Sequence, residues 1–330
     1  MAVYTTIDNP ELYFQVKLYS GTGSSNAITL DGDEDMQPDM IWIKNRADSV
    51  DHRIFDSVRG ASKSLIPNNT DAEYNDTSTV MLSSFNSDGF TVVSHSNVND
   101  SSDSHVAYCW KESADSGFDI ISYAGNGSAA RELSHSLSAT PHFIIVKNRD
   151  DSVDWFVYHQ GMSDDNNNKL NTTDAQFGGA YIYDPTSSIF KLRDHNVVND
   201  SGDDYIAYAF TEKQGFSKAG SFEGLSSTDG PFIYTGFTPS MILYKNADYA
   251  ENWHIQSWKQ ESLNPNNNQI TPNETYAESS DSNTNIDFLS NGFKMRSSHR
   301  TSNYTGDTFI YIAFADAPFV NSNGVPCNAR

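Results

Sequence analysis

The chain repeats one pattern of apolar and polar positions three times. In each copy a proline opens a continuous apolar run that ends in Lys-Asn. The three runs are PDMIWIKN from Pro38, PHFIIVKN from Pro141 and PSMILYKN from Pro239. Runs of β-branched and aromatic residues without a polar face are typical of strands that are buried on both sides. We therefore predict strands, and not helices, at residues 40–44, 143–147 and 241–245.

Other landmarks recur in the same order around these runs. Alternating strands contain SDGFTVV at Phe90, SSIFKLR at Phe190 and SNGFKMR at Phe293. Asn-led loops follow as NDSSD, NDSGD and NYTGD, and the closing strands are HVAYCWKE, YIAYAFTE and FIYIAFAD. Equivalent landmarks lie 98 to 104 residues apart. A fixed period of this kind indicates a structural unit that has been copied.

The repeat predicts an all-β fold of three tandem β-sandwich units, jelly-roll-like, with about 100 residues in each. We place the units at 1–115, including an N-terminal segment, at 116–214, and at 215–330, including a C-terminal tail. A unit of this size is large enough to have a core of its own. The joints KESADSG and TEKQG are short, so we expect the three units to pack as one rigid body.

The net charge of the chain argues against partners that are themselves negatively charged. It has 43 acidic and 21 basic residues, a formal net charge of −22. Nucleic acids and anionic membrane surfaces are bound by clustered Lys and Arg, so we expect neither as a partner. No segment approaches the roughly 20 apolar residues that a membrane helix needs. The first residues, MAVYTTIDNP, also lack the basic and apolar regions of a secretory signal. We expect no membrane insertion.

Sequence motifs for catalysis are not found. The chain has no G-x-S-x-G, no phosphate-binding loop and no dinucleotide fingerprint. Its nine histidines form neither H-x-x-x-H nor H-E-x-x-H, and Cys109 lies in an apolar run typical of a buried thiol. We therefore predict that the protein is not an enzyme. A polysaccharide depolymerase stays an alternative, because glycoside hydrolysis needs only two carboxylates.

The Asn-led loops are the one pattern that suggests a cofactor. Their oxygen-bearing side chains recur as Asn99, Asp100 and Asp103; Asn199, Asp200, Asp203 and Asp204; and Asn303 and Asp307. Groups of this type bind Ca²⁺. Asn and Asp are equally typical of tight turns, and this interpretation explains the same residues. We predict no cofactor, with Ca²⁺ as the alternative.

The repeated motifs resemble a family of repeat-containing phage virion proteins, tail-fibre-like or structural, from marine and cyanobacterial phages. The matching pieces are PDMIWIKNRADS, STDGPFIYTGF, FLSNGFKMRSS, YIAFADAPF and the terminal Asn328-Ala329-Arg330. The resemblance implies a virion component that is assembled in the host cytoplasm, and it brings no catalytic residue with it. The third copy departs from the Lys-Asn-Arg motif, because Ala247 stands where the first two copies have arginine.

The resemblance and the polar loops together predict a tail-fibre, spike or tip protein that adsorbs to host surface glycan. Aromatic rings stack on sugar rings and amides bond to hydroxyls, so the expected binding surface contains Tyr249, Trp253, Trp258 and Tyr304. The alternative is a capsid decoration or head-fibre protein. Since the chain has no fibrous shaft, other virion proteins are expected partners. A homo-oligomer is also implied by the resemblance, a trimer being one form that phage fibres take.

Overall fold

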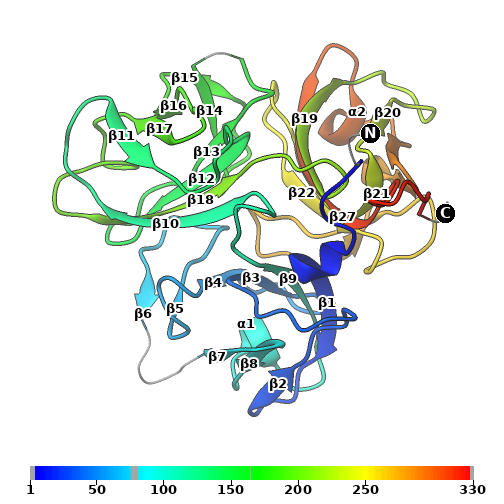
Figure 1. The fold of residues 1–330 in the computed structure, drawn as a ribbon, viewed down its shortest axis with the longest axis horizontal. Coiled ribbons are helices and arrows are strands. Elements are labelled where there is room, and N and C mark those ends of the chain that lie inside the picture. Colours follow the sequence, from blue (N-terminus) through cyan, green and yellow to red (C-terminus); the bar gives the residue numbers. More distant parts are fainter. Residues whose placement is uncertain (1–3, 76–80, 164, 328–330) are drawn as a thin grey trace.

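The computed structural model describes residues 4–75, 81–163 and 165–327, and it confirms the predicted all-β fold. Antiparallel strands make up nearly all of the regular structure (Figure 1). The helical elements are single turns: η1 (Pro10–Leu12), α1 (Ser96–Asn99), η2 (Ser282–Thr284) and α2 (Arg300–Asn303). Within the described ranges, no helix has the length and apolar character needed to span a membrane.

Three large sheets share one strand order, in which the closing strand lies between the opening strand and the Pro-led strand. The first sheet joins β1 (Phe14–Ser20), β9 (Ser104–Trp110), β3 (Met40–Asn45) and β4 (Arg53–Asp56). The second joins β10 (Phe118–Ala124), β18 (Asp204–Phe210), β12 (Phe143–Asn148) and β13 (Phe156–His159), and β14 (Asn166–Lys169) and β15 (Phe177–Gly178) extend it. The third joins β19 (Ser217–Glu223), β27 (Thr308–Pro318), β21 (Phe237–Asn246) and β22 (Trp253–Ser257).

Each large sheet packs one face against a smaller sheet, which makes a sandwich. The small sheets are β2 (Asn26–Ile28), β8 (Gly89–Val92) and β7 (Leu82–Asn86); β11 (Arg131–Ser134), β17 (Ile189–Leu192) and β16 (Ile182–Tyr183); and β20 (Phe232–Tyr234), β26 (Gly292–Met295) and β25 (Ile286–Leu289). Two short pairs complete the strands: β5 (Lys63–Ser64) with β6 (Tyr74–Asn75), and β23 (Asn268–Gln269) with β24 (Ser279–Ser280). The predicted boundaries at 115 and 214 fall between sheets, but as domain boundaries they stay a prediction.

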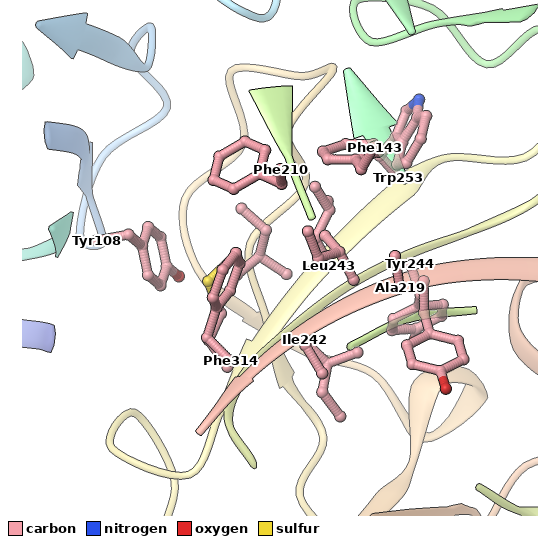
Figure 2. Packing of buried hydrophobic residues seen from close by; sticks show 14 of the residues in the cluster. Tyr108, Phe143, Phe210, Ala219, Ile242, Leu243, Tyr244, Trp253 and Phe314 are labelled. Carbon is pink, nitrogen blue, oxygen red and sulfur yellow. The ribbon is translucent and has the colours of Figure 1, made fainter. Parts of the chain in front are cut away.

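The Pro-led strands are buried on both faces, as their apolar runs predict. In β3, Ile41 and Ile43 pack in the core of the first sandwich, whereas Met40 and Trp42 pack in a second, central core. Successive side chains of a strand point to opposite faces, so one continuous apolar run serves two cores. The strands β12 and β21 divide their side chains in the same way, and Figure 2 shows Leu243 and Ile242 on opposite sides of β21.

The central core joins the three large sheets around a group of aromatic rings. Trp110, Phe210 and Phe314 hold the same position in the three closing strands. Their ring centroids lie 6.4, 5.6 and 5.7 Å apart, so each ring contacts both others. All three side chains are buried. Figure 1 shows the three bodies arranged around this common centre. The sheets therefore share one core at the middle of the molecule.

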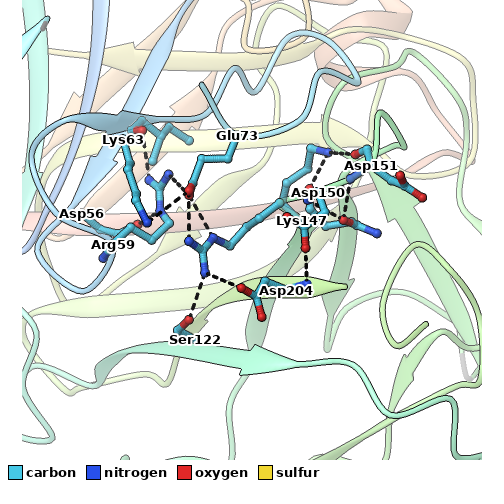
Figure 3. Close-up of polar contacts among 12 residues, drawn as sticks. Asp56, Arg59, Lys63, Glu73, Ser122, Lys147, Asp150, Asp151 and Asp204 are labelled. Carbon is cyan, nitrogen blue, oxygen red and sulfur yellow. Dashed lines mark hydrogen bonds and ion pairs between the residues drawn. The ribbon is translucent and has the colours of Figure 1, made fainter. Parts of the chain in front are cut away.

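Polar seams close the sheets into a ring. At the first seam, between the first and second sheets, the Arg149 guanidinium donates two hydrogen bonds to the Glu73 carboxylate at 2.9 and 3.0 Å (Figure 3). At the third seam, between the third and first sheets, Arg46 donates to Glu278 at 2.8 and 2.7 Å. The main-chain N–H groups of Glu73 and Glu278 also donate to the carbonyls of Arg149 and Arg46.

The second seam, between the second and third sheets, keeps the main-chain bond and changes the side chains. The N–H of Gln176 donates to the carbonyl of Ala247 at 2.6 Å. These two residues occupy the places of glutamate and arginine at the other seams. The Gln176 amide donates to Asp248 instead. The loss of the arginine in the third copy is thus matched by the loss of the glutamate charge across the seam.

The lysine of each Lys-Asn exit is buried at or near a seam. The ammonium of Lys147 donates to the carbonyl of Thr70 at 3.2 Å, and that of Lys245 donates to Thr173 at 3.0 Å, so each reaches the preceding copy. Lys44 donates to the carbonyls of its own turn. Burial lowers the pKa of Lys44 and Lys147 to about 8 and that of Lys245 to about 7.

Removal of one partner of a seam pair should cost more than removal of both. Arg46→Ala leaves the Glu278 carboxylate, whose side chain is 11% exposed, without its guanidinium. We expect a loss of about 1–2 kcal/mol in the free energy of unfolding. The double variant Arg46→Ala/Glu278→Gln copies the second seam, so we expect it to be more stable than the single variant. Urea unfolding followed by circular dichroism measures both.

The control for this comparison is an exposed pair away from the seams. Lys191 and Asp184 lie 3.0 Å apart, with side chains 31% and 62% exposed, so Lys191→Ala should change stability by less than about 0.5 kcal/mol. A double variant that is less stable than Arg46→Ala alone would contradict the interpretation of the seams as matched pairs.

Candidate functional site

A polar cleft of about 410 Å³ opens beside the second sheet. We call it cleft A. Its walls come from the end of β13, the loop that follows, and β16 with its turn. The lining residues are Tyr158, Gln160, Met162, Ser163, Asp165, Asn166, Ile182, Tyr183, Asp184 and Pro185. Aromatic rings, carboxylates and amides thus face one hollow.

Local backbone geometry places these side chains. Side chains alternate along β13, so Tyr158 lies on the opposite face from Val157, which packs in the central core. On β16 the side chain of Ile182 is buried and that of Tyr183 is half-buried at the cleft. Asp165 and Asp184 have φ values of 62° and 46°. Asp tolerates this left-handed conformation better than most residues, which is consistent with acidic residues at both turns.

The floor of the cleft is held in place by hydrogen bonds. The Gln160 amide donates to the Glu212 carboxylate of the same unit at 2.8 Å, and to the carbonyl of Ala219 in the third sheet at 2.7 Å. Beneath it, His159 is buried, and its two ring nitrogens contact the Tyr311 carbonyl and the Gly161 N–H at 2.9 Å each. Burial lowers the pKa of His159 to about 4, so the ring is neutral at pH 7.

The chemistry of the lining favours a neutral ligand with many hydroxyl groups. The carboxylates of Asp165 and Asp184 accept hydrogen bonds, and the amides of Gln160 and Asn166 both donate and accept. None of the described residues that line cleft A is Lys or Arg. Since the chain has a formal net charge of −22, an anionic ligand would be repelled.

The four aromatic residues predicted as a binding surface are not all at the surface of the molecule. Tyr249 and Tyr304 lie together, with the Arg300 guanidinium 4.2 and 4.0 Å from their ring centroids. They are 48% and 39% exposed. Trp258 is half-buried and packs against the central core.

The prediction was wrong for Trp253, which is only 1% exposed. It begins β22, in which every side chain is buried. Its indole N–H donates to the carbonyl of Lys169 at 2.8 Å, across the second seam. Trp253 therefore stabilises the ring of sheets and does not face solvent.

The asparagines that lead the Asn-led loops have a structural role. Asn99, Asn199 and Asn303 are fully buried. Their side-chain oxygens accept the main-chain N–H groups of Thr22, Asn126 and Leu225, at 2.9, 3.1 and 2.8 Å. Each asparagine thus ties its loop to the turn after the opening strand, which agrees with the turn interpretation.

Acidic residues of the first copy do come together at this end of the sandwich. Carboxylate oxygens of Asp48, Asp100 and Asp103 lie within 4.8 Å of one another. In the third copy Tyr249 and Tyr304 take the places of the first two, and Arg300 pairs with Asp307 at 3.3 Å. In the third copy, the guanidinium of Arg300 therefore supplies a positive charge at the place where the first copy has only carboxylates. A group of carboxylates near the surface does not by itself identify a metal site.

Sequence reasoning missed cleft A because no motif marks it. Its walls are brought together by strand pairing, and Tyr158 and Tyr183 are 25 positions apart in the chain. One local signal was available. The segment YIYDP, which ends in Pro185, differs in sequence from the segments at the same place in the other two copies, MLSSF and NIDFL. A departure from the repeat that places a tyrosine before an Asp-Pro turn is a reasonable place to look for a feature specific to the second copy.

The comparisons with known proteins give one match. A family model described as a domain of unknown function, DUF7483, matches residues 9–318. No curated protein and no solved structure matches the chain. The matched segment contains all strands of the three large sheets and the whole lining of cleft A.

Proposed function

This chain belongs to the DUF7483 family, and we propose that it is a non-enzymatic structural component of a tailed-phage virion that binds surface glycan of the host. In this proposal the protein is part of a tail fibre, spike or tip. It docks on other virion proteins and presents cleft A to the host cell. The repeated motifs of the sequence support the virion assignment by resemblance.

The ring of sheets supports a role in presenting a binding site. The three sheets share a central core, and hydrogen bonds cross each of the three seams. Tyr158 of β13 and Tyr183 of β16, the two tyrosines that line cleft A, lie on strands of this framework, and strands hold side chains in place better than free loops do. The acidic surface also fits a virion protein, because a net charge far from zero keeps particles soluble and apart.

The observation that carries the proposal is the lining of cleft A. Tyr158 and Tyr183 supply flat rings that can stack on the apolar face of a sugar. Carboxylates and amides beside them can accept and donate hydrogen bonds to hydroxyl groups. The lack of Lys and Arg in the described lining favours neutral sugars over sulfated or uronic acid polymers.

Substitution of one tyrosine tests the proposal. Labelled protein should bind host cells and a panel of neutral microbial oligosaccharides, and Tyr183→Ala should weaken both by about tenfold, because a stacked ring is lost. Tyr276→Ala is the matched control, since Tyr276 is 55% exposed and lies outside cleft A. Flow cytometry and glycan arrays provide the measurements.

Two other experimental outcomes would support a different function. Binding of the protein to isolated capsids, with no binding to cells, would assign a capsid decoration or head-fibre role. Release of reducing ends from host polysaccharide would assign a depolymerase. If Tyr183→Ala and the wild type bind equally well, cleft A is not the glycan-binding site.

A further inference from the structure

A second cleft lies on the other side of the Gln160 side chain. It has a volume of about 320 Å³, and we call it cleft B. It lies where the end of the second sheet meets the start of the third. Its lining residues are Tyr4, Glu212, Gln214, Ser217, Lys218, Tyr234, Thr235 and Gly236. Like cleft A, it combines tyrosine rings with amide, hydroxyl and carboxylate groups.

The two clefts share a wall. Gln160 lines cleft A, and its amide donates to the carboxylate of Glu212, which lines cleft B, at 2.8 Å. The same amide donates to the carbonyl of Ala219, the neighbour of Lys218 in β19. Gly161 also lies against β19, where an added Cβ would come within 2.8 Å of the Ser221 Cβ. The wall is therefore a tight contact between the second and third sheets.

Exposed aromatic rings extend the surface beyond cleft B. Phe232 and Tyr234 are 45% and 47% exposed, whereas Ile233 between them is buried, so both rings lie on the same outer face of β20. The Tyr4 hydroxyl donates to the Gly236 carbonyl at 2.7 Å and lies 3.1 Å from the Tyr234 hydroxyl. Burial, with a smaller effect of the hydrogen bond to Tyr234, raises the pKa of Tyr4, so its phenol stays protonated.

We propose that clefts A and B are the two ends of one groove, which binds an extended segment of a neutral polysaccharide. In this proposal the polymer segment crosses the shared wall at the Gln160–Glu212 pair. The inference rests on the proposed glycan-binding function and adds the size and extent of the ligand. A single sugar would fill one cleft, whereas a polymer segment contacts tyrosines at both ends.

The distribution of charge agrees with a neutral polymer. The described lining of the two clefts contains one basic side chain, Lys218, and three acidic ones, Glu212, Asp165 and Asp184. Lys218 lies over the ring of Tyr234, with its ammonium 5.8 Å from the ring centroid. Lys191 also lies 3.0 Å from Asp184, so the three carboxylates face two ammonium groups, and an anionic polymer would still meet a net negative charge. An extended peptide is the competing occupant, since β20 is an edge strand that a peptide could extend.

Oligosaccharides of increasing length test the inference. The probes are oligomers of glucose, mannose, galactose and N-acetylglucosamine with two to eight sugar residues, and calorimetry gives the affinity of the intact protein for each. We expect affinity for one of these series to rise at least tenfold from the shortest oligomers to the longest. Tyr234→Ala should weaken binding of the long oligomers about tenfold and leave the short ones unchanged, whereas Tyr183→Ala should weaken both.

Control variants separate binding from folding. Phe232→Ala changes only an exposed ring beyond cleft B and should also weaken the long oligomers selectively. Tyr276→Ala should match the wild type at every length. Far-UV circular dichroism checks that each variant keeps the wild-type content of strands.

The outcomes distinguish this inference from the function on which it rests. Equal affinity at every length, with no effect of Tyr234→Ala or Phe232→Ala, overturns the groove and leaves glycan binding by cleft A in place. A lack of binding to every oligosaccharide overturns both. Selection of extended peptides from a display library, with loss of their binding in Tyr234→Ala and no binding of sugars, assigns the groove to a polypeptide instead.

Discussion

Replacing Phe314 by alanine is expected to lower the free energy of unfolding by about 4 kcal/mol, within the usual range for emptying a buried phenylalanine site. The side chain is 3% exposed, and its ring centroid lies 4.8 Å from that of Phe14. It also contacts Trp110 and Phe210 from the other two large sheets. A cavity at this place removes contacts from all three sheets together. We therefore expect unfolding to stay a single transition with a lower midpoint.

Guanidinium unfolding, followed by tryptophan fluorescence and by circular dichroism, measures this effect. Leu263→Ala is the control, since Leu263 is 72% exposed and its removal should change stability by less than about 0.5 kcal/mol. A loss below about 1 kcal/mol for Phe314→Ala would contradict the central role of the aromatic group. Two separate transitions in the variant would show that one sheet can unfold without the others.

Replacing Arg59 by methionine is expected to cost about 3–5 kcal/mol, the usual effect of leaving a buried charge without its partner. The Arg59 side chain is fully buried, and its guanidinium contacts the Asp56 carboxylate at 2.5 Å (Figure 3). It also donates to the Tyr208 hydroxyl at 3.3 Å and to Glu73 at 3.2 Å. Methionine fills much of the same volume and supplies none of these bonds.

The double variant Arg59→Met/Asp56→Asn identifies the cause. It removes the unpaired carboxylate, so we expect it to recover part of the stability that Arg59→Met loses. Glu73 keeps its two hydrogen bonds from Arg149 in either variant. Equilibrium unfolding in urea measures both proteins. If the double variant is less stable than the single one, the loss comes from packing and not from the buried charge.

The apolar runs of the sequence predicted the strands well, because local pattern decides them. A run such as MIWIK has no polar face, and β3 indeed divides it between two cores. The lysine that ends each run lies inside the predicted strand, and the run itself does not show what its ammonium contacts. In the structure carbonyl groups surround the buried ammonium, and for Lys147 and Lys245 one of these carbonyls comes from the preceding copy. A pattern within one copy carries no information about such a neighbour.

The seams pair residues from different copies, and the sequence alone does not show which residues face each other. The change to Ala247 in the third copy was visible, and its matching change to Gln176 lies 71 positions earlier in a different copy. Only the ring arrangement shows that these positions face each other. Trp253 was misplaced for a similar reason, since an aromatic residue near polar loops looks exposed until the second seam covers it.

The candidate site was the least predictable part of the molecule. Cleft A takes residues from β13, β16 and the loops between, and cleft B takes residues from the N-terminal segment and from both sides of the second seam. Tyr4 and Tyr234 meet although 230 positions separate them. Tyrosine, glutamine and aspartate are also common surface residues, so their types alone did not distinguish a cleft from an ordinary wet surface.

The unequal seams mean that the three copies are not interchangeable. Gene conversion between tandem repeats tends to make them identical. If the exit of the first copy overwrote that of the third, an arginine would face Gln176 in place of Ala247. If the polar block of the first copy overwrote that of the second, a glutamate would face Ala247 with no guanidinium opposite. Either exchange breaks a matched pair of residues at a seam. The ring of sheets therefore limits how far gene conversion can make the three repeats identical.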